Sequence, residues 1–229
     1  MKRILISVLF IGLIQACGTQ QIKNDINYET DLGYPQETEN FVVKDIHVYD
    51  DPFLGAALTW IDPRYPSDNI TLYVYPVPKT DWSDVNETLS EEMDRVYEAV
   101  KYSVEQGKYT QVEAEEREAF AFEEEGEMFS GLKSAFNTYL ENDRKINSNA
   151  YLFIIEDKFV KFRTSFDALL TPDWNGDNIV KELLPVIEVP PESEYVRNIR
   201  AQHREVEEQQ SQELIKLLLE AIEKNGEEE

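Results

Sequence analysis

Hydrophobic and polar residues alternate along several segments of the chain, as they do in β-strands that bury one face. In the clearest segment, Ile70, Leu72 and Val74 share one face, and the stretch 62–68, with two prolines, precedes it as a turn. Three such strands are predicted first, at residues 41–49, 54–61 and 69–77. Because short turns separate them, the pattern predicts an antiparallel β-meander.

A helical period follows the third strand. Thr88 and Glu91 have the spacing of a capping box, in which the two side chains satisfy free backbone N–H groups at a helix start. Apolar residues then recur three or four positions apart, and Gly107 is placed to end the helix. The pattern predicts an amphipathic helix that lies across one face of the sheet.

A second run of strands is predicted between residues 109 and 166. Its segments are 109–122, 128–140, 150–155 and 159–166. The last two flank the compact turn 156–158, and the polar stretch 142–149 is predicted as a longer turn. These strands extend the antiparallel sheet begun by the meander.

The end of the chain is predicted to be helical. A helix over 174–187 has Asp173 or Asp177 at its positive end, and a proline pair closes the domain at residue 190. Residues 191–229 form an acidic C-terminal helical extension. Its early half has few apolar residues, and its late half has an apolar stripe that includes Leu214, Leu218 and Ile222. We expect a long helix that either docks by its late end or binds a partner.

This order of elements resembles the PsbP-like α+β family, which includes DcrB-like bacterial lipoproteins and secretion adaptors. The segment TLYVYP (71–76) and the hairpin AYLFIIEDKFVKFRTSF (150–166) carry the resemblance, which covers residues 41–189. It implies an antiparallel β-sheet packed against helices. It also implies a non-enzymatic role in assembling membrane complexes or binding protein partners, and no set of family residues can be matched onto this chain.

The first sixteen residues have the pattern of a signal peptide. Two basic residues precede the apolar run Ile4–Ile14, whose helical length of about 16 Å is too short for a bilayer core of roughly 30 Å. Residues 13–17 resemble the bacterial lipobox, although Gln15 stands where a small residue is usual. The resemblance implies cleavage between Ala16 and Cys17, and a diacylglycerol thioether and palmitate on Cys17. A plain signal peptide with an incidental cysteine is the alternative.

The rest of the N-terminal region fits an anchored envelope protein. Cys17 is the single cysteine, so the exported chain has no disulfide framework. Gly18 follows it where an Asp often retains lipoproteins at the inner membrane, which favours the outer membrane and a domain that faces the periplasm. Residues 17–40 are polar and aperiodic and are predicted as a flexible tether to a domain at 41–190.

The charge of the chain restricts its partners. The formal net charge is −24, which excludes nucleic acid as a partner, because binding to phosphates needs clustered Lys and Arg. An anionic surface is also repelled by anionic lipids, so contact with the bilayer is expected through Cys17 alone. Solubility explains the charge most simply, and a basic partner or divalent cations fit it as well.

Candidates for catalysis are few. His47 and His203 are the only histidines, and the motifs of serine hydrolases, zinc proteases, P-loop proteins and dinucleotide-binding proteins are missing from the sequence. Asp and Asn alternate over 173–178 without the Gly and Glu of a calcium loop. The Glu-rich segment 113–127 fits a solvated edge. We therefore expect no catalytic residue, no metal and no cofactor.

Aromatic residues around the first hairpin are the remaining candidates. Trp60, Tyr73 and Tyr75 form either core or a surface that binds a partner or ligand. With Leu214, Leu218 and Ile222 they are the predicted partner-binding residues. We expect a non-catalytic accessory lipoprotein that binds an envelope protein; a lipoprotein that binds a small ligand or divalent cation is the alternative.

Overall fold

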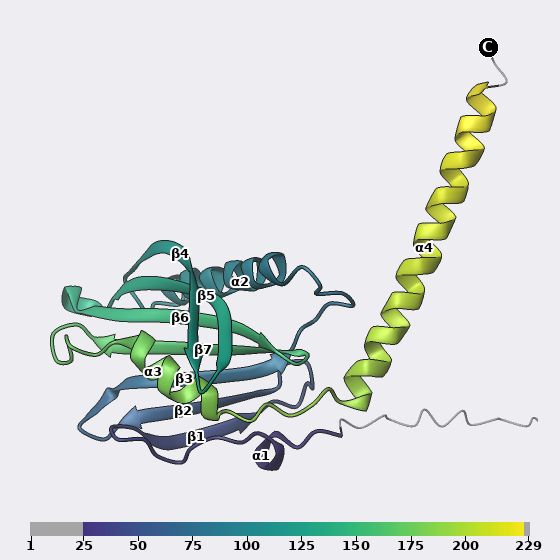
Figure 1. The fold of residues 1–229 in the computed structure, drawn as a ribbon. Coiled ribbons are helices and arrows are strands. Elements are labelled where there is room, and N and C mark those ends of the chain that lie inside the picture. The colour runs from purple at the N-terminus through teal and green to yellow at the C-terminus, as the bar shows by residue number, and fades with distance from the viewer. Residues whose placement is uncertain (1–24, 227–229) are drawn as a thin grey trace, which may run out of the picture.

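The computed structural model describes residues 25–226, and within this range the side chains of 114–116, 142 and 218–226 lie outside the described part. A seven-stranded antiparallel sheet in the order β1-β2-β3-β7-β6-β5-β4 forms the centre (Figure 1). Its strands are β1 (Val42–Val48), β2 (Ala56–Asp62), β3 (Tyr65–Pro76), β4 (Gln111–Glu124), β5 (Glu127–Tyr139), β6 (Lys145–Ile155) and β7 (Lys158–Asp167). Strands adjacent in sequence pair with each other, except that β3 pairs with β7 and thereby joins the two halves of the sheet.

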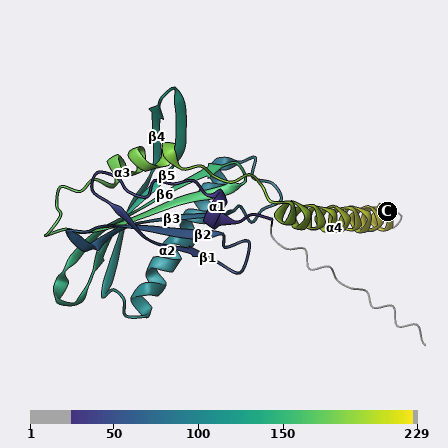
Figure 2. The same cartoon turned by 90° about the horizontal axis from the view of Figure 1, so that it is seen from below.

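Helices pack on both faces of the sheet (Figures 1 and 2). The described helices are α1 (Tyr28–Asp31), α2 (Val85–Glu105), α3 (Gly176–Leu183) and α4 (Glu194–Gly226), of which the first three pack on the sheet. Short 3-10 turns lie at Glu141–Asp143 and Leu184–Val186. Leu89, Met93 and Val96 of α2 pack on one face. The helices α1 and α3 cover the other face, where the larger core contains Trp60 and Phe162. The predicted fold class is confirmed: an α+β fold with an antiparallel sheet packed against helices and a C-terminal helical extension.

Several element boundaries differ from the prediction. The helix α2 begins three residues before Thr88, because the carboxylate of Asp84 accepts the backbone N–H of Glu87 at 2.9 Å. The helix α3 is capped by the side chain of Asn175, which accepts the N–H of Asp177 at 2.9 Å. Two predicted turns, 62–68 and 142–149, are largely strand, because pairing within the sheet extends β3 and β6 into polar sequence.

Residues 25–40 pack against the domain, so the prediction of a flexible tether over 17–40 is wrong for this part. Tyr28 is 1% exposed and Leu32 is 4% exposed, and both belong to the larger core. The backbones of Gly33 and Glu188 exchange hydrogen bonds of 3.0 and 2.9 Å. The apolar residues of this segment are too sparse to show a period, but each fills a place in the core. The predicted signal peptide, Ala16 and Cys17 lie outside the described residues.

The helix α4 leaves the domain and extends into solvent (Figures 1 and 2). It packs by its beginning, where Val196 is 2% exposed, and every residue from Ala201 to Leu217 is exposed. Within the described residues, the structure therefore does not show α4 docked on the domain by its late end. None of the helices described is both long and apolar enough to cross a membrane.

Candidate functional site

The base of α4 is held by one buried arginine, Arg200. Its guanidinium pairs with Asp157 at 2.9 Å and with Glu192, and it donates to the carbonyl oxygens of Val77 at 2.6 Å and of Asp157 at 3.2 Å. It also lies 4.5 Å from the ring centroid of Trp82, a cation–π contact. The Arg200 side chain is only 6% exposed, so these bonds form in a dry environment and fix where α4 begins.

Other polar contacts tie the chain segments around Arg200 together. Lys158 is fully buried beside Asp157, and its ammonium donates to the carbonyl of Pro191 at 3.0 Å. The hydroxyl of Ser193 accepts the N–H of Val196 at 3.0 Å and caps the helix. The β6–β7 turn, the linker that follows α3 and the first turns of α4 thus form one junction, which we call the α4 junction.

The first described residue of the chain also belongs to the α4 junction. The carboxylate of Asp25 accepts the backbone N–H groups of Glu194 at 3.0 Å and Tyr195 at 3.4 Å. The Glu194 hydrogen bond is the main cause that lowers the pKa of Asp25, as expected for an anion at a helix N-terminus. The described part of the chain therefore begins beside the start of α4.

The free part of α4 carries apolar side chains with nothing packed on them. Leu214, Ile215 and Leu217 are 58%, 57% and 55% exposed. Eighteen residues make about five helical turns, so Leu214 and Leu217 lie on the same face of α4 as Val196 and Ile199, which adjoin the domain at its base. Of the residues predicted to form the apolar stripe, Leu214 is exposed; the side chains of Leu218 and Ile222 lie outside the described part.

The predicted aromatic surface is divided between the two faces of the sheet. Trp60 is 0% exposed, and its indole N–H donates to the carbonyl of Pro35 at 3.0 Å, so it does not form a surface for a partner. Tyr73 and Tyr75 point to the opposite face. The prediction that Trp60, Tyr73 and Tyr75 act together at the surface is therefore wrong. Trp60 pairs with Ile70 and shares its face, and successive residues along β3 alternate between faces, so Tyr73 and Tyr75 lie on the other face.

Tyr75 instead belongs to a buried polar link between α2 and the sheet. Its hydroxyl donates to Glu92 at 2.5 Å and accepts from Lys161 at 2.9 Å. Lys161 lies 4.9 and 4.8 Å from the ring centroids of Tyr73 and Tyr75. Burial lowers the pKa of Lys161 to about 8, although the carboxylate of Glu92, 3.8 Å away, favours the charged form. The side chains of Tyr75, Glu92 and Lys161 thus join α2 to β3 and β7 of the sheet.

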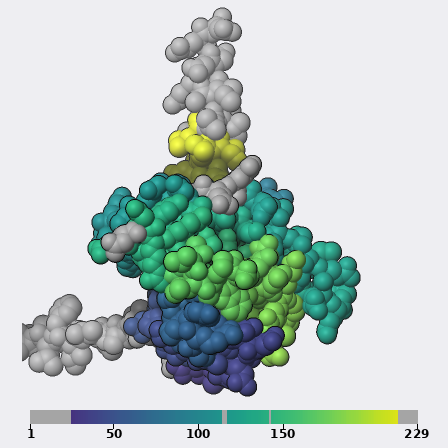
Figure 3. Space-filling model, turned by 90° about the vertical axis from the view of Figure 1, so that its left-hand side faces the viewer, coloured from purple at the N-terminus to yellow at the C-terminus, as the bar shows by residue number. Residues whose placement is uncertain are grey.

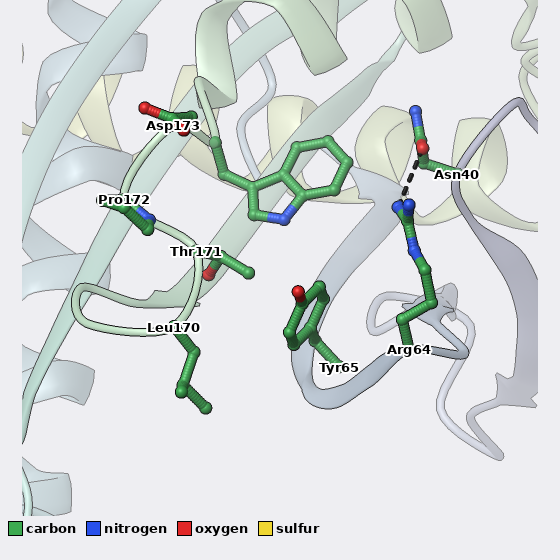
Figure 4. A pocket seen from close by; sticks show the side chains of 8 residues that line it. Asn40, Arg64, Tyr65, Leu170, Thr171, Pro172 and Asp173 are labelled. Atoms are coloured by element: carbon green, nitrogen blue, oxygen red, sulfur yellow. Dashed lines mark hydrogen bonds between the residues drawn. The ribbon is translucent and has the colours of Figure 1, made fainter.

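Two hollows adjoin at one end of the sheet, on either side of Trp174. The first, which we call the Arg64 hollow, has a volume of about 340 Å³ (Figure 4). Its lining comprises Asn40, Arg64, Tyr65, Leu170, Thr171, Pro172, Asp173 and Trp174. Arg64 is held in place there, because its guanidinium donates to Asn40 at 2.9 Å and pairs with the buried carboxylate of Asp62 at 2.8 Å.

The second, which we call the amide hollow, has a volume of about 390 Å³ and shares Pro172, Asp173 and Trp174 with the first. Its floor is the face of β5 and β6 that α3 leaves open, with the half-buried side chains of Asn137, Asn147 and Asn149. Figure 3 looks onto this end of the molecule, where the green segment that contains these shared residues lies between the teal strands and the blue and purple strands.

The segment that carries Trp174 is rigidly attached. The indole lies 4.9 Å from the ring centroid of Phe41 and stacks on Phe166 at 5.9 Å. The hydroxyl of Thr171 donates to the buried carboxylate of Asp68, and its backbone N–H donates to the carbonyl of Asp167 at 3.0 Å. Trp174 therefore has a fixed position at the border that the two hollows share.

The remaining candidate residues do not come together. His47 and His203 are both exposed, and His47 packs edge-on against Tyr49 at 4.6 Å. Asp177, in the predicted Asp/Asn loop, accepts from Tyr151 at 2.6 Å and pairs with Lys133 at 3.0 Å. Among the described residues there is no cluster of three or more His, Cys, Asp or Glu side chains suited to hold a metal ion.

Sequence reasoning missed Arg200 and Trp174. Arg200 lies in the part of α4 that has few apolar residues, where an arginine is expected to be exposed to solvent. Only the folded structure places Asp157 next to it. Trp174 stood at the start of a predicted helix, and its neighbours in the Arg64 hollow come from distant segments. No local signal distinguishes either residue.

Comparisons with known proteins concern the fold. No protein-family model matches the sequence, and no curated protein matches it. The chain is similar to the solution structure of cyanobacterial PsbP (CyanoP) from Synechocystis sp. PCC 6803, with a TM-score of 0.44 and 14% sequence identity. The match covers 78% of this chain and 99% of that chain. The similarity says nothing of the family, the activity or the partners of this chain.

Proposed function

We propose that this chain is the precursor of an envelope lipoprotein whose domain is a non-catalytic accessory module that binds another envelope protein through α4. The observation that carries the proposal is the exposure of Leu214, Ile215 and Leu217 on a helix whose base is locked to the domain. Apolar side chains that are exposed to water on a fixed helix are unfavourable in the free protein. Such side chains commonly bind in a hydrophobic groove of a partner.

The chemistry of the partner follows from the residues around the stripe. Glu205, Glu208 and Glu213 precede or flank it in α4, and the whole chain carries −24. An apolar groove with a basic rim complements this surface, because opposite potentials steer association and disfavour wrong partners. The 33-residue helix is about 50 Å long, so its far end reaches well beyond the domain.

Membrane attachment rests on the sequence and is supported by the position of Asp25. Asp25 follows Cys17 by eight positions, a reach of at most about 28 Å when extended. A lipid on Cys17 would therefore hold the α4 junction close to the bilayer, in the outer membrane and facing the periplasm as Gly18 favours. Labelling of cells with a palmitate analogue tests the anchor: the label should attach to the protein and be lost in Cys17→Ser.

A matched pair of variants tests the role of α4. In Leu214→Glu/Leu217→Glu the stripe is broken, and in Gln209→Glu/Gln212→Glu the same charge is added at the same spacing among exposed polar residues. Capture from detergent-solubilised envelopes should retain one dominant protein with the wild type and the Gln variant and lose it with the Leu variant. Equal retention by both variants would overturn binding through α4.

Small-ligand binding is a second candidate function. The observation that favours it is the pair of hollows around Trp174, away from the aromatic residues first expected to carry it.

A further inference from the structure

We infer that the Arg64 hollow and the amide hollow form one binding site for a neutral oligosaccharide chain, with Trp174 between two sugar subsites. The two hollows share Pro172, Asp173 and Trp174, so a ligand longer than one sugar ring crosses from one to the other. Their volumes, about 340 and 390 Å³, lie in the range of small-molecule sites. This inference is independent of the role of α4, which begins at the other end of the sheet.

The amide hollow offers uncharged hydrogen-bonding side chains beside the charged Lys133, Asp173 and Asp177. Asn147 lies on the face of β6 that lines the hollow, and Asn149, on the same face, also donates its amide N–H to the hydroxyl of Thr164 at 3.4 Å. A side-chain amide both donates and accepts, as sugar hydroxyls do. The small side chain of Ala135, opposite Asn149, leaves the floor between them low.

The Arg64 hollow offers aromatic rings. Tyr65 and Trp174 both line it, and sugar rings pack their apolar C–H faces on such rings. Because Phe41 and Phe166 already hold the Trp174 indole, little conformational entropy is lost when a ligand packs against it.

The charges in both hollows disfavour an anionic ligand, and Asp173 adds a carboxylate to each of them. Arg64 is paired with Asp62, and Lys133 is paired with both Asp177 and Glu118 at 3.0 and 2.9 Å. An anionic ligand would meet no free positive charge there and would be repelled by the acidic chain. An extended peptide would need apolar pockets for its side chains, and the side chains on the floor of the amide hollow are mainly polar.

The test is a ¹H–¹⁵N spectrum of the full chain in detergent, titrated with the tetrasaccharide of N-acetylglucosamine, with cellotetraose, and with a neutral Gly/Ser/Asn peptide. The chain has three tryptophans, so three indole N–H signals report separately. The signal of Trp174 should shift saturably with a tetrasaccharide. Those of Trp60, in the core, and Trp82, at the α4 junction, should stay unchanged.

Variants tie the shift to the amide hollow. Asn147→Ala should weaken saccharide binding about fivefold, as expected for one lost hydrogen bond, and Asn147→Gln should weaken it less. The matched control is Asn86→Ala, an exposed asparagine on α2, which should leave binding unchanged. The inference is overturned by no shift of Trp174 with either saccharide, by a shift with the peptide alone, or by equal affinity of Asn147→Ala and Asn86→Ala.

Discussion

Arg200 is the residue whose loss should most weaken the attachment of α4. Arg200→Ala removes ion pairs to Asp157 and Glu192 and leaves the carbonyl of Val77 without its donor. Removing one partner of a buried ion pair costs about 3–5 kcal/mol. Because Asp157 keeps Lys158 as a second partner, we expect the lower end, about 3 kcal/mol.

Two measurements locate this loss. Urea unfolding followed by tryptophan fluorescence gives the free energy of unfolding of the domain, and hydrogen exchange of the amides of residues 198–203 gives the opening of the helix base. The decrease in the free energy of unfolding of the domain cannot exceed the free energy that docks α4. If docking is weakened beyond that point, the helix undocks while the sheet stays folded. Arg204→Ala is the control, since Arg204 is exposed and makes one bond to Thr80 at 3.1 Å; we expect less than about 0.5 kcal/mol. Unchanged unfolding and unchanged exchange in Arg200→Ala would refute the described junction.

Three further predictions concern stability. Because the folded-state pKa of Lys161 is about 8 and its unfolded value is near 10.5, the unfolded chain binds more protons between these values. The free energy of unfolding should therefore rise from pH 8 to 10, by up to about 1.4 kcal/mol per pH unit, and Lys161→Met should lack this rise in urea titrations. Gly55→Ala should cost more than about 2 kcal/mol in the same assay, because Gly55 has φ +59° and an added Cβ would lie 2.0 Å from the carbonyl oxygen of Val74; a smaller loss would contradict that contact. Leu214→Glu/Leu217→Glu should change the free energy of unfolding by less than about 0.5 kcal/mol, and a larger loss would mean that these side chains are packed in the free protein.

The strands could be predicted because the sheet buries alternate residues. Ile70, Leu72 and Val74 are all buried in the larger core, as their alternation indicates. Strand ends could not be predicted in the same way, because Lys145 joins β6 through pairing with Tyr139, and backbone pairing leaves no mark on side-chain pattern.

The candidate site was harder to predict than the fold. The helical stripe that contains Leu214 could be predicted from its spacing, but its exposure could not, because the spacing fits a docked helix as well as a free one. The burial of Arg200 did not follow, because a charged side chain is buried only when distant partners compensate it. The alternation of β2 and β3 does not tell which residues of the two strands face the same core, so Trp60 and Tyr75 could not be assigned to opposite faces.

Site-specific photo-cross-linking in intact cells tests the central claim most directly. A photoreactive amino acid is placed at Leu217, in the exposed stripe of α4, and in a second strain at Leu169, which is 84% exposed and belongs to the domain. If α4 binds an envelope protein, position 217 yields one dominant adduct that position 169 does not, and the adduct disappears with Cys17→Ser. No adduct at position 217, or the same adducts at both positions, would contradict the account.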